Sequence, residues 1–286
     1  MIIDCHAHYE PRMLRVESML AKMDQAGVDR VVLVPAMNDI FPHIPESLLT
    51  LMRTLMNSPL RPVARAVHWL TLTGDGHVKV GGRKVSIYPQ PDNQSVAQLV
   101  ELHPQRLQGW IFLNPAHDPQ VLDTLERWRG VPGMIGVKLH PHWHEYKTRL
   151  LDPLLARCQE LNLPVLIHLG FGKHGDYRHI CSTYPKLKLI CAHAGFPFYK
   201  ELWRYAADCP NLYVDLSSPY IDEKLANRAV KAMGPERCLY GTDAPYGFED
   251  NDGYNYAEIK GWIERMPLPP NKAEAILGSN FLRICH

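Results

Sequence analysis

A repeated alternation of short apolar runs and segments with helical periodicity is the feature that most restricts the fold of this chain. Residues 2–8 begin with two isoleucines and predict a short buried strand, residues 13–26 place apolar side chains at helical spacing, and residues 30–35 form an apolar run. A strand, a helix and a second strand in this order require parallel strands, because a crossover helix returns the chain to the starting edge of the sheet. The chain is therefore expected to be an α/β protein.

The same alternation continues to the C-terminus. We expect eight strands, at residues 2–8, 30–35, 107–113, 134–140, 164–168, 187–193, 211–216 and 238–243. Helical spacing occurs at residues 13–26, 96–103, 119–129, 150–161, 176–184, 197–207, 221–233, 257–265 and 272–284. No linker or charge run separates these elements, so residues 1–286 are expected to form one domain, and α/β barrels commonly have about 250 residues.

Residues 37–93 depart from this rhythm. Residues 45–56 have the spacing of an amphipathic helix, and residues 61–72 are ambiguous between helix and strand. Short apolar runs on either side of Gly81–Gly82 predict a hairpin or flap. We interpret residues 37–93 as an insertion after the second strand, placed where it could act as a lid over a site or make a subunit contact.

The amino-acid composition argues against several classes of protein. Lys and Arg total 31 and Asp and Glu total 30, so no nucleic-acid-binding or anionic-membrane surface is expected. The sequence has no apolar run of about 18 residues and no signal peptide, which favours a cytoplasmic protein with no membrane partner. The seven cysteines are odd in number and scattered, which is typical of reduced thiols. The expected partner is a small-molecule substrate.

Two histidines lie at the end of the first expected strand. Side chains on a strand alternate between faces, so His6 and His8 point the same way. Two imidazoles in this arrangement can bind one metal ion, although zinc takes about four ligands. An isolated His-x-His pair also occurs at solvated strand edges, so the pair needs support from the rest of the chain.

That support comes from the ends of later strands. Lys138 and His140 close the fourth strand, His168 the fifth, His193 the sixth and Asp243 the eighth. Each has a structural explanation when taken alone, since a histidine in this position is commonly a hydrogen-bonded core residue and an aspartate can cap the next helix. In a closed parallel barrel, however, these strand ends meet on one face. Together they favour a metal site.

Other polar residues near strand ends are interpreted as structural. Asp215, at the end of the seventh strand, is expected to cap a helix or anchor a turn. His142 and His144 follow Pro141 and are expected in an exposed loop. Lys173 and Arg178 are expected to be solvated surface residues.

Several motifs, in this order along the whole chain, resemble those of the amidohydrolase superfamily, in its branch of metal-dependent hydrolases and decarboxylases. The motifs are Ile-Asp-Cys-His-Ala-His (3–8), Gly-Val-Lys-Leu-His-Pro (136–141), Pro-Val-Leu-Ile-His (164–168), His-Ala-Gly (193–195), Asn-Leu-Tyr-Val-Asp (211–215), Leu-Tyr-Gly-Thr-Asp-Ala-Pro (239–245) and Ile-Leu-Gly-Ser-Asn (276–280). The resemblance implies a (β/α)8 TIM barrel that holds a divalent metal. Residues 37–93 match no motif of the family.

The resemblance also implies a ligand set. One metal would be bound by four residues: His6, His8, His168 and Asp243. His193 would lie beside the substrate or the reacting water. Lys138 and His140 would bind a substrate carboxylate or carbonyl, although a carboxylated Lys138 bridging two metals stays open. Imidazole and carboxylate ligands suit Zn²⁺, with Mn²⁺ and Fe²⁺ as alternatives, and one ion is favoured over two.

The expected activity is hydrolysis of an amide, ester or lactone bond by metal-activated water, with Asp243 and His193 as the catalytic residues. An alternative is non-oxidative decarboxylation of an aromatic or unsaturated carboxylic acid, for which Asp243 would transfer a proton at carbon. Aromatic residues near strand ends fit a flat substrate: Trp143, Phe171, Phe196, Phe198, Tyr220 and Tyr246. A barrel kept only for binding is a further alternative. By family analogy the protein is expected to be a homodimer or homotetramer.

Overall fold

Eight parallel strands form the central sheet in a computed structural model that describes residues 1–80, 82–250 and 253–285. Each strand pairs with the next along the chain. They are β1 (Ile3–Tyr9), β2 (Arg30–Pro35), β5 (Leu107–Phe112), β6 (Met134–Leu139), β7 (Val165–Ile167), β8 (Leu189–Cys191), β9 (Leu212–Asp215) and β10 (Cys238–Leu239). The prediction of an α/β protein with eight strands is confirmed.

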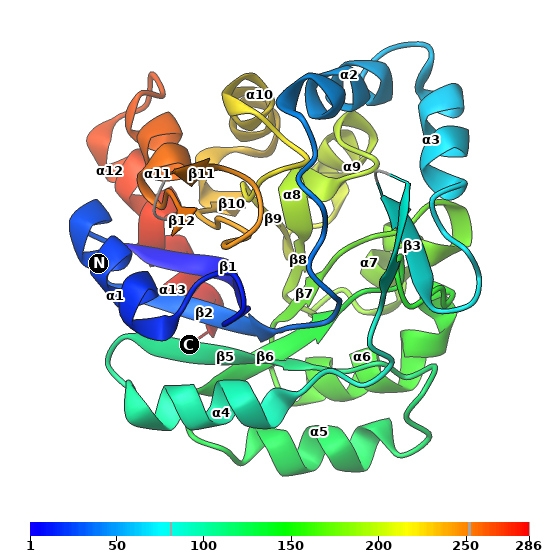
Figure 1. Cartoon of the computed structure of the whole chain (residues 1–286), viewed down its shortest axis with the longest axis horizontal. Coiled ribbons are helices and arrows are strands. Elements are labelled where there is room, and N and C mark those ends of the chain that lie inside the picture. The colour runs from blue at the N-terminus through cyan, green and yellow to red at the C-terminus, as the bar shows by residue number, and fades with distance from the viewer. Residues whose placement is uncertain (81, 251–252, 286) are drawn as a thin grey trace.

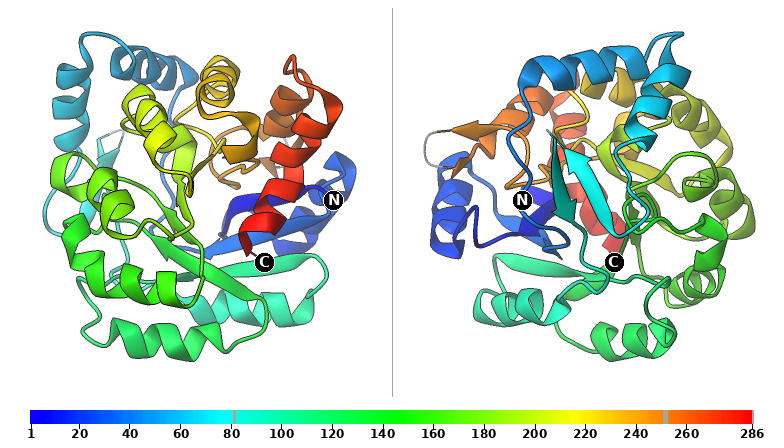
Figure 2. Two further views of the ribbon diagram at one scale, coloured as in Figure 1. Left: turned by 180° about the vertical axis from the view of Figure 1, so that it is seen from behind. Right: turned by 45° about the vertical axis from the view of Figure 1, so that its right-hand side comes forward.

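Backbone hydrogen bonds close this sheet into a barrel (Figures 1 and 2). The N–H of Cys5 donates to the carbonyl of Tyr240 at 3.0 Å, and the N–H of His8 donates to the carbonyl of Ala244 at 2.6 Å. These bonds join β1 to the segment that follows β10. The TIM-barrel architecture expected from the sequence is therefore present.

Both faces of the strands are buried, which explains why they read as continuous apolar runs. On β2, Val32 and Val34 pack in one cluster with Trp110, whereas Val31 and Leu33 pack in a second cluster that includes side chains of the surrounding helices. A parallel strand that is covered on both sides has no solvent-exposed face, so polar and apolar residues do not alternate along it. All seven cysteines lie in the described part of the chain and none is paired in a disulfide.

Helices surround the barrel where periodicity predicted them. They are α1 (Val16–Ala26), α4 (Asn93–Leu102), α5 (Val121–Arg129), α6 (Asp152–Glu160), α7 (Tyr177–Thr183), α9 (Lys200–Tyr205), α10 (Glu223–Met233), α11 (Ala257–Glu264), α12 (Pro270–Glu274) and α13 (Asn280–Cys285). The single helix expected over residues 272–284 is divided, because a π-helical turn at Ala275–Ser279 separates α12 from α13. Within the described residues, no helix has the length and apolar character needed to cross a membrane.

Residues between β2 and β5 form a separate group of elements. They contain α2 (Glu46–Met56), α3 (Arg61–Trp69) and an antiparallel hairpin of β3 (His77–Val80) and β4 (Arg83–Ser86). The ambiguous stretch 61–72 is thus largely helical, and the predicted hairpin is present, although Gly81 lies outside the described residues. Figure 1 shows α2 and α3 along the outer edge of the molecule.

Candidate metal centre

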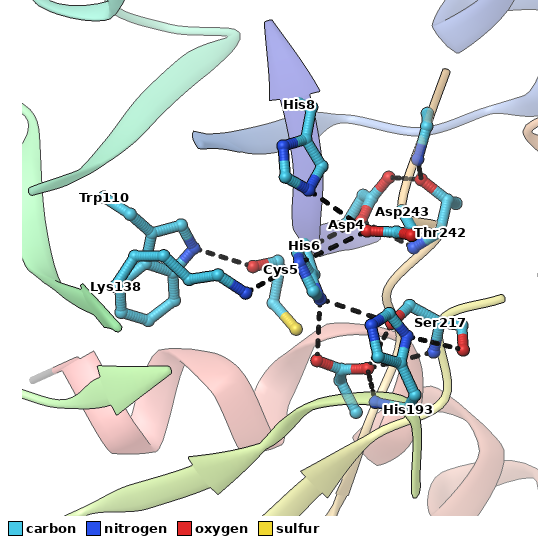
Figure 3. Close-up of polar contacts among 12 residues, drawn as sticks. Asp4, Cys5, His6, His8, Trp110, Lys138, His193, Ser217, Thr242 and Asp243 are labelled. Carbon is cyan, nitrogen blue, oxygen red and sulfur yellow. Dashed lines mark hydrogen bonds and ion pairs between the residues drawn. The ribbon is translucent and has the colours of Figure 1, made fainter. Parts of the chain in front are cut away.

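The side chains of His6, His8 and Asp243 converge at the carboxyl end of the barrel (Figure 3). Nε2 of His8 lies 3.1 Å from Oδ1 of Asp243, and Nε2 of His6 lies 3.4 Å from the same oxygen. One ligand atom from each residue lies within 4.8 Å of the other two, and all three residues are buried. The structure therefore brings together three of the four predicted metal ligands.

Asp243 reaches this position because the chain leaves strand geometry early. The strand expected over residues 238–243 ends at Leu239, and Asp243 has a left-handed φ of 64°. The N–H groups of Thr242 and Asp243 both donate to the carbonyl of His6, at 3.1 and 2.7 Å. The buried carboxyl group of Asp4 accepts the N–H and the hydroxyl of Thr242, at 3.1 and 2.5 Å. Left-handed backbone at a non-glycine residue is costly and clusters at functional sites.

Three histidines near this point have an unprotonated Nε2, which carries a lone pair. Nδ1 of His6 lies 3.0 Å from Oδ2 of Asp215, Nδ1 of His193 lies 3.3 Å from the carbonyl of Ser217, and Nδ1 of His168 lies 3.2 Å from the carbonyl of Leu169. Because each Nδ1 faces an acceptor oxygen, it carries the proton and donates. Nε2 is then the unprotonated nitrogen, which is the form that binds a metal.

Burial keeps these imidazoles neutral. It lowers the pKa of His8 to about 3 and that of His193 to about 4, and it holds the pKa values of His6 and His168 well below their usual range. Burial also raises the pKa of Asp243 to about 7, although the charges of His193 and Lys138 oppose this shift. Neutral nitrogen donors beside a carboxylate fit a divalent transition metal.

His168 is the predicted ligand that the structure leaves apart from the other three. Its ring stacks on His140 at 4.3 Å and contacts His193 at 4.8 Å, both between ring centroids. Its Nε2 is buried and has no hydrogen-bond partner among the described residues. A buried lone pair without a partner is itself a reason to expect a ligand there, because leaving it unpaired costs about 1–3 kcal/mol.

Asp215 anchors the turn at Ser217, as expected, and it also belongs to this site. Besides His6, it accepts the N–H of His193 at 2.9 Å and the N–H of Ser217 at 3.0 Å, both through Oδ1. His6, His193 and Asp215 also form a second group whose ligand atoms lie within 4.8 Å of one another. The signal was present in the sequence, since Asp215 closes an apolar strand just as His168 and Asp243 were expected to do.

Comparison with known proteins agrees with this geometry. Residues 3–284 match the family model described as amidohydrolase. This protein belongs to the amidohydrolase family. A relative, the 2-keto-4-carboxy-3-hexenedioate hydratase of Sphingobium sp. (strain NBRC 103272 / SYK-6), is 21% identical over 340 residues, which cover 99% of this chain and 96% of the relative.

Solved structures share the fold of this chain over almost its full length. The 4-oxalomesaconate hydratase of Rhodopseudomonas palustris has a TM-score of 0.65 and 18% identity, with 100% of this chain and 95% of the other covered. The 5-carboxyvanillate decarboxylase of Sphingomonas paucimobilis has a TM-score of 0.59 and 15% identity, with 99% and 98% covered. At these identities the structures establish the shared fold.

Lys138 and His140 lie beside the candidate metal ligands. Nζ of Lys138 is 3.1 Å from Nε2 of His6, and burial lowers the pKa of Lys138 to about 8, against the opposing charges of Asp243 and Asp215. His140 is also buried, and its Nδ1 accepts the N–H of Trp143 at 3.2 Å. Lys138 therefore supplies a cation next to the candidate metal position.

The prediction that His142 and His144 are surface residues is wrong. Both are buried, with 1% and 7% of their surface exposed. The loop after β6 folds back over the barrel end, so that the ring of His142 stacks 6.0 Å from that of His168, and Nε2 of His144 lies 3.1 Å from the carbonyl of Tyr88 in the insertion. Lys173 and Arg178 are exposed, as expected.

Aromatic rings border the histidines, and some of them were singled out in the sequence. Tyr220 stacks on Phe196 at 4.4 Å and contacts His193 at 4.9 Å, measured between ring centroids. On another side, Tyr246 contacts His8 at 5.3 Å, and Phe41 from the insertion contacts Trp143 at 4.9 Å. The site is thus bordered largely by flat apolar side chains.

A buried arginine of the insertion holds the loop that carries Tyr220. Nε and Nη2 of Arg53 donate to the carbonyl of Pro219 at 3.0 and 2.6 Å, and only 3% of Arg53 is exposed. The hydroxyl of Tyr199 donates to the carbonyl of Tyr220 at 2.6 Å. The segment 37–93, which was expected to lie where it could cover a site, therefore contacts the wall of the site, but no feature of the sequence indicated that Arg53 makes this contact.

Proposed function

We propose that this protein is a metal-dependent enzyme that adds water to the double bond of a small unsaturated carboxylic acid. The observation that carries the metal dependence is the convergence of His6 and His8 on one carboxylate oxygen of Asp243. Hydration is favoured because the relative that matches this chain over almost its whole length is a hydratase.

The residues that would hold the ion are His6, His8, His168 and Asp243. A divalent ion there would lower the pKa of a water molecule from about 16 toward about 7 and would polarise a substrate oxygen. Zinc suits these ligands best, with manganese or iron as alternatives. Occupation by two ions would require either a carboxylated Lys138 or the second group formed by His6, His193 and Asp215.

Asp243 is suited to transfer protons, because burial places its pKa at about 7. In hydration, the oxygen of water bonds to one carbon of the double bond while Asp243 accepts a proton from that water. Asp243 then gives a proton to the neighbouring carbon, so that the elements of water are added. His193 presents an Nε2 lone pair that can hold the water or receive a proton, and Lys138 can pair with the substrate carboxylate.

Hydrolysis of an amide, ester or lactone, which the sequence predicts, is the second candidate, and it is supported by membership of the amidohydrolase family. The same residues would act, but the oxygen of water would bond to a carbonyl carbon and Asp243 would pass its proton to the leaving group. Decarboxylation is a third candidate, supported by the aromatic border at Phe196 and Tyr220. There Asp243 would donate a proton to the carbon that loses carbon dioxide.

One experiment separates these reactions. Purified protein is stripped with a chelator, reloaded with Zn²⁺, Mn²⁺ or Fe²⁺, and assayed with unsaturated keto acids, with lactones and amides, and with aromatic acids. Loss of the substrate's double-bond absorbance only in reloaded protein would support hydration. Release of acid from lactones or amides would instead identify the reaction as hydrolysis. Release of carbon dioxide would identify it as decarboxylation. If the protein takes up no metal and turns over none of these compounds, the remaining hypothesis is a barrel that only binds a ligand.

A further inference from the structure

Helices α9 and α10 pack against each other on the outside of the barrel (Figure 1), and a cavity lies between them. Its volume is about 400 Å³, and five residues line it: Lys200 and Trp203 of α9, with Arg228, Lys231 and Ala232 of α10. We call this cavity the α9–α10 groove. Pockets that bind small molecules have volumes of about 300–1,000 Å³, so the groove has room for a small ligand.

The groove gathers positive charge without a counter-charge. Three of its lining side chains are cationic, and none is a carboxylate. Among the residues that the structure describes, no side-chain ion pair or hydrogen bond is made by Lys200, Arg228 or Lys231. Arg228 and Lys231 are three positions apart on α10, where like charges destabilise a helix. An anion in the groove would relieve this repulsion.

The carboxylates of the same two helices are engaged elsewhere. Each helix contains one acidic residue, Glu201 in α9 and Glu223 in α10. Glu201 pairs with Arg61 of the insertion, and Oε1 of Glu223 lies 3.0 Å from Nε of Arg265. Asp222, which precedes α10, caps the N-terminus of that helix. The positive charge of the groove is therefore left for a ligand from outside the chain.

The indole of Trp203 connects the groove to the candidate metal centre. Only 4% of Trp203 is exposed, and its Nε1 donates to the carbonyl of Ala194 at 2.8 Å. Ala194 and the neighbouring His193 both have left-handed φ values, of 54° and 55°. A ligand in the groove would thus contact a side chain that supports the turn at His193.

We propose that the α9–α10 groove binds a small phosphorylated molecule, with its phosphate among the three cations and its organic part against Trp203 and Ala232. A phosphate monoester carries a charge of about −1.5 to −2 and three oxygens that accept hydrogen bonds, which suits several cationic side chains better than the single charge of a carboxylate. Arginine binds phosphate through two parallel hydrogen bonds, and lysine binds it as a point charge. This site is separate from the residues proposed to catalyse the reaction.

Calorimetric titration of the full-length protein, as purified, tests the proposal. The probes are AMP, ribose 5-phosphate, inorganic phosphate and uncharged adenosine. AMP or ribose 5-phosphate should bind about 10-fold more tightly than inorganic phosphate or adenosine, since only the first two offer both a phosphate and an organic part. Which of these two binds more tightly distinguishes a nucleoside phosphate from a sugar phosphate.

Two double variants locate the binding. Lys200→Ala/Lys231→Ala should lower the affinity for the tighter probe about 10-fold or more, because two charge-assisted contacts are lost. Lys147→Ala/Arg149→Ala is the matched control, since it removes the same charge from exposed residues outside the groove, and its affinity should equal that of the wild type. Phosphate bound at the metal centre would be affected by neither variant.

Four results would overturn the proposal. They are no binding of any probe at millimolar concentration, organic phosphates that bind no more tightly than inorganic phosphate, an unchanged affinity in Lys200→Ala/Lys231→Ala, and an equal loss in both double variants, which would identify general attraction between ions. Circular dichroism checks that each variant is folded. If the groove variant does not fold, Lys231→Ala alone takes its place, with a weaker affinity expected and an unchanged affinity as the contrary result.

Discussion

Nδ1 of His6 lies 3.0 Å from Oδ2 of Asp215, although 209 residues separate them in the sequence. Both side chains are buried, and the carboxylate fixes the tautomer in which Nε2 of His6 faces Asp243. Carboxylates in this position orient a ligating imidazole and increase its basicity. Asp215 is therefore a positioning residue for the candidate metal centre.

Replacing Asp215 with Asn should weaken metal binding. The amide cannot accept all the donors that the carboxylate accepts from His6, His193 and Ser217, so we expect metal affinity to fall about 10–100-fold. Titration against a competing chelator measures the affinity. The exposed Asp208→Asn variant is the control and should bind as the wild type does. An Asp215→Asn affinity within two-fold of wild type would contradict this role.

Replacing Asp243 with Asn should remove most activity while the fold persists. The amide neither accepts a proton nor carries a negative charge, so turnover should fall about 10²–10⁴-fold at saturating metal. Metal content, measured by elemental analysis in the same samples, separates a lost proton acceptor from a lost ligand. Substantial turnover by metal-loaded Asp243→Asn protein would exclude Asp243 as the proton acceptor.

Replacing Arg53 with Met should disturb the wall of the site from a distance. The carbonyl of Pro219 loses two donors and only the hydrogen bond from Tyr199 to Tyr220 remains, so Tyr220 is held less firmly against His193, and we expect KM to rise several-fold with metal content unchanged. Arg61→Met is the control, because Arg61 lies in the same insertion but pairs with Glu201. Equal kinetic effects of the two substitutions would show that Arg53 acts only through the stability of the insertion.

Replacing Lys138 with Met should stabilise the metal-free protein near pH 7. Burial lowers the pKa of Lys138 from 10.5 to about 8, so between these values the unfolded chain binds more protons and stability rises with pH. Below pH 8 the full penalty applies, about 3 kcal/mol. The advantage of Lys138→Met in thermal unfolding should thus be largest at pH 7 and shrink toward pH 10.5. Exposed Lys173→Met should show no such trend, and an advantage that grows with pH would refute the argument.

Much of the fold could be predicted from periodicity alone. The strand at residues 30–35 has the predicted bounds, because a strand buried on both faces must be apolar throughout, and the helix that ends at Ala26 is followed by Gly27 with the expected left-handed φ of 66°. The end of β10 could not be predicted in this way. Residues 240–243 were expected to continue the strand, but hydrogen bonds to the carbonyl of His6 and the carboxyl group of Asp4 turn them toward the site.

The sequence by itself determined the barrel and the residue types available at the ends of its strands, because both depend on patterns local to each strand and helix. His6, His8 and Asp243 could be identified because each closes an apolar run. Only the tertiary structure decided that Asp215 orients His6, that His142 is buried, and that Arg53 supports Tyr220. Those contacts join segments far apart in the chain, and their free energy depends on burial, which no local pattern records.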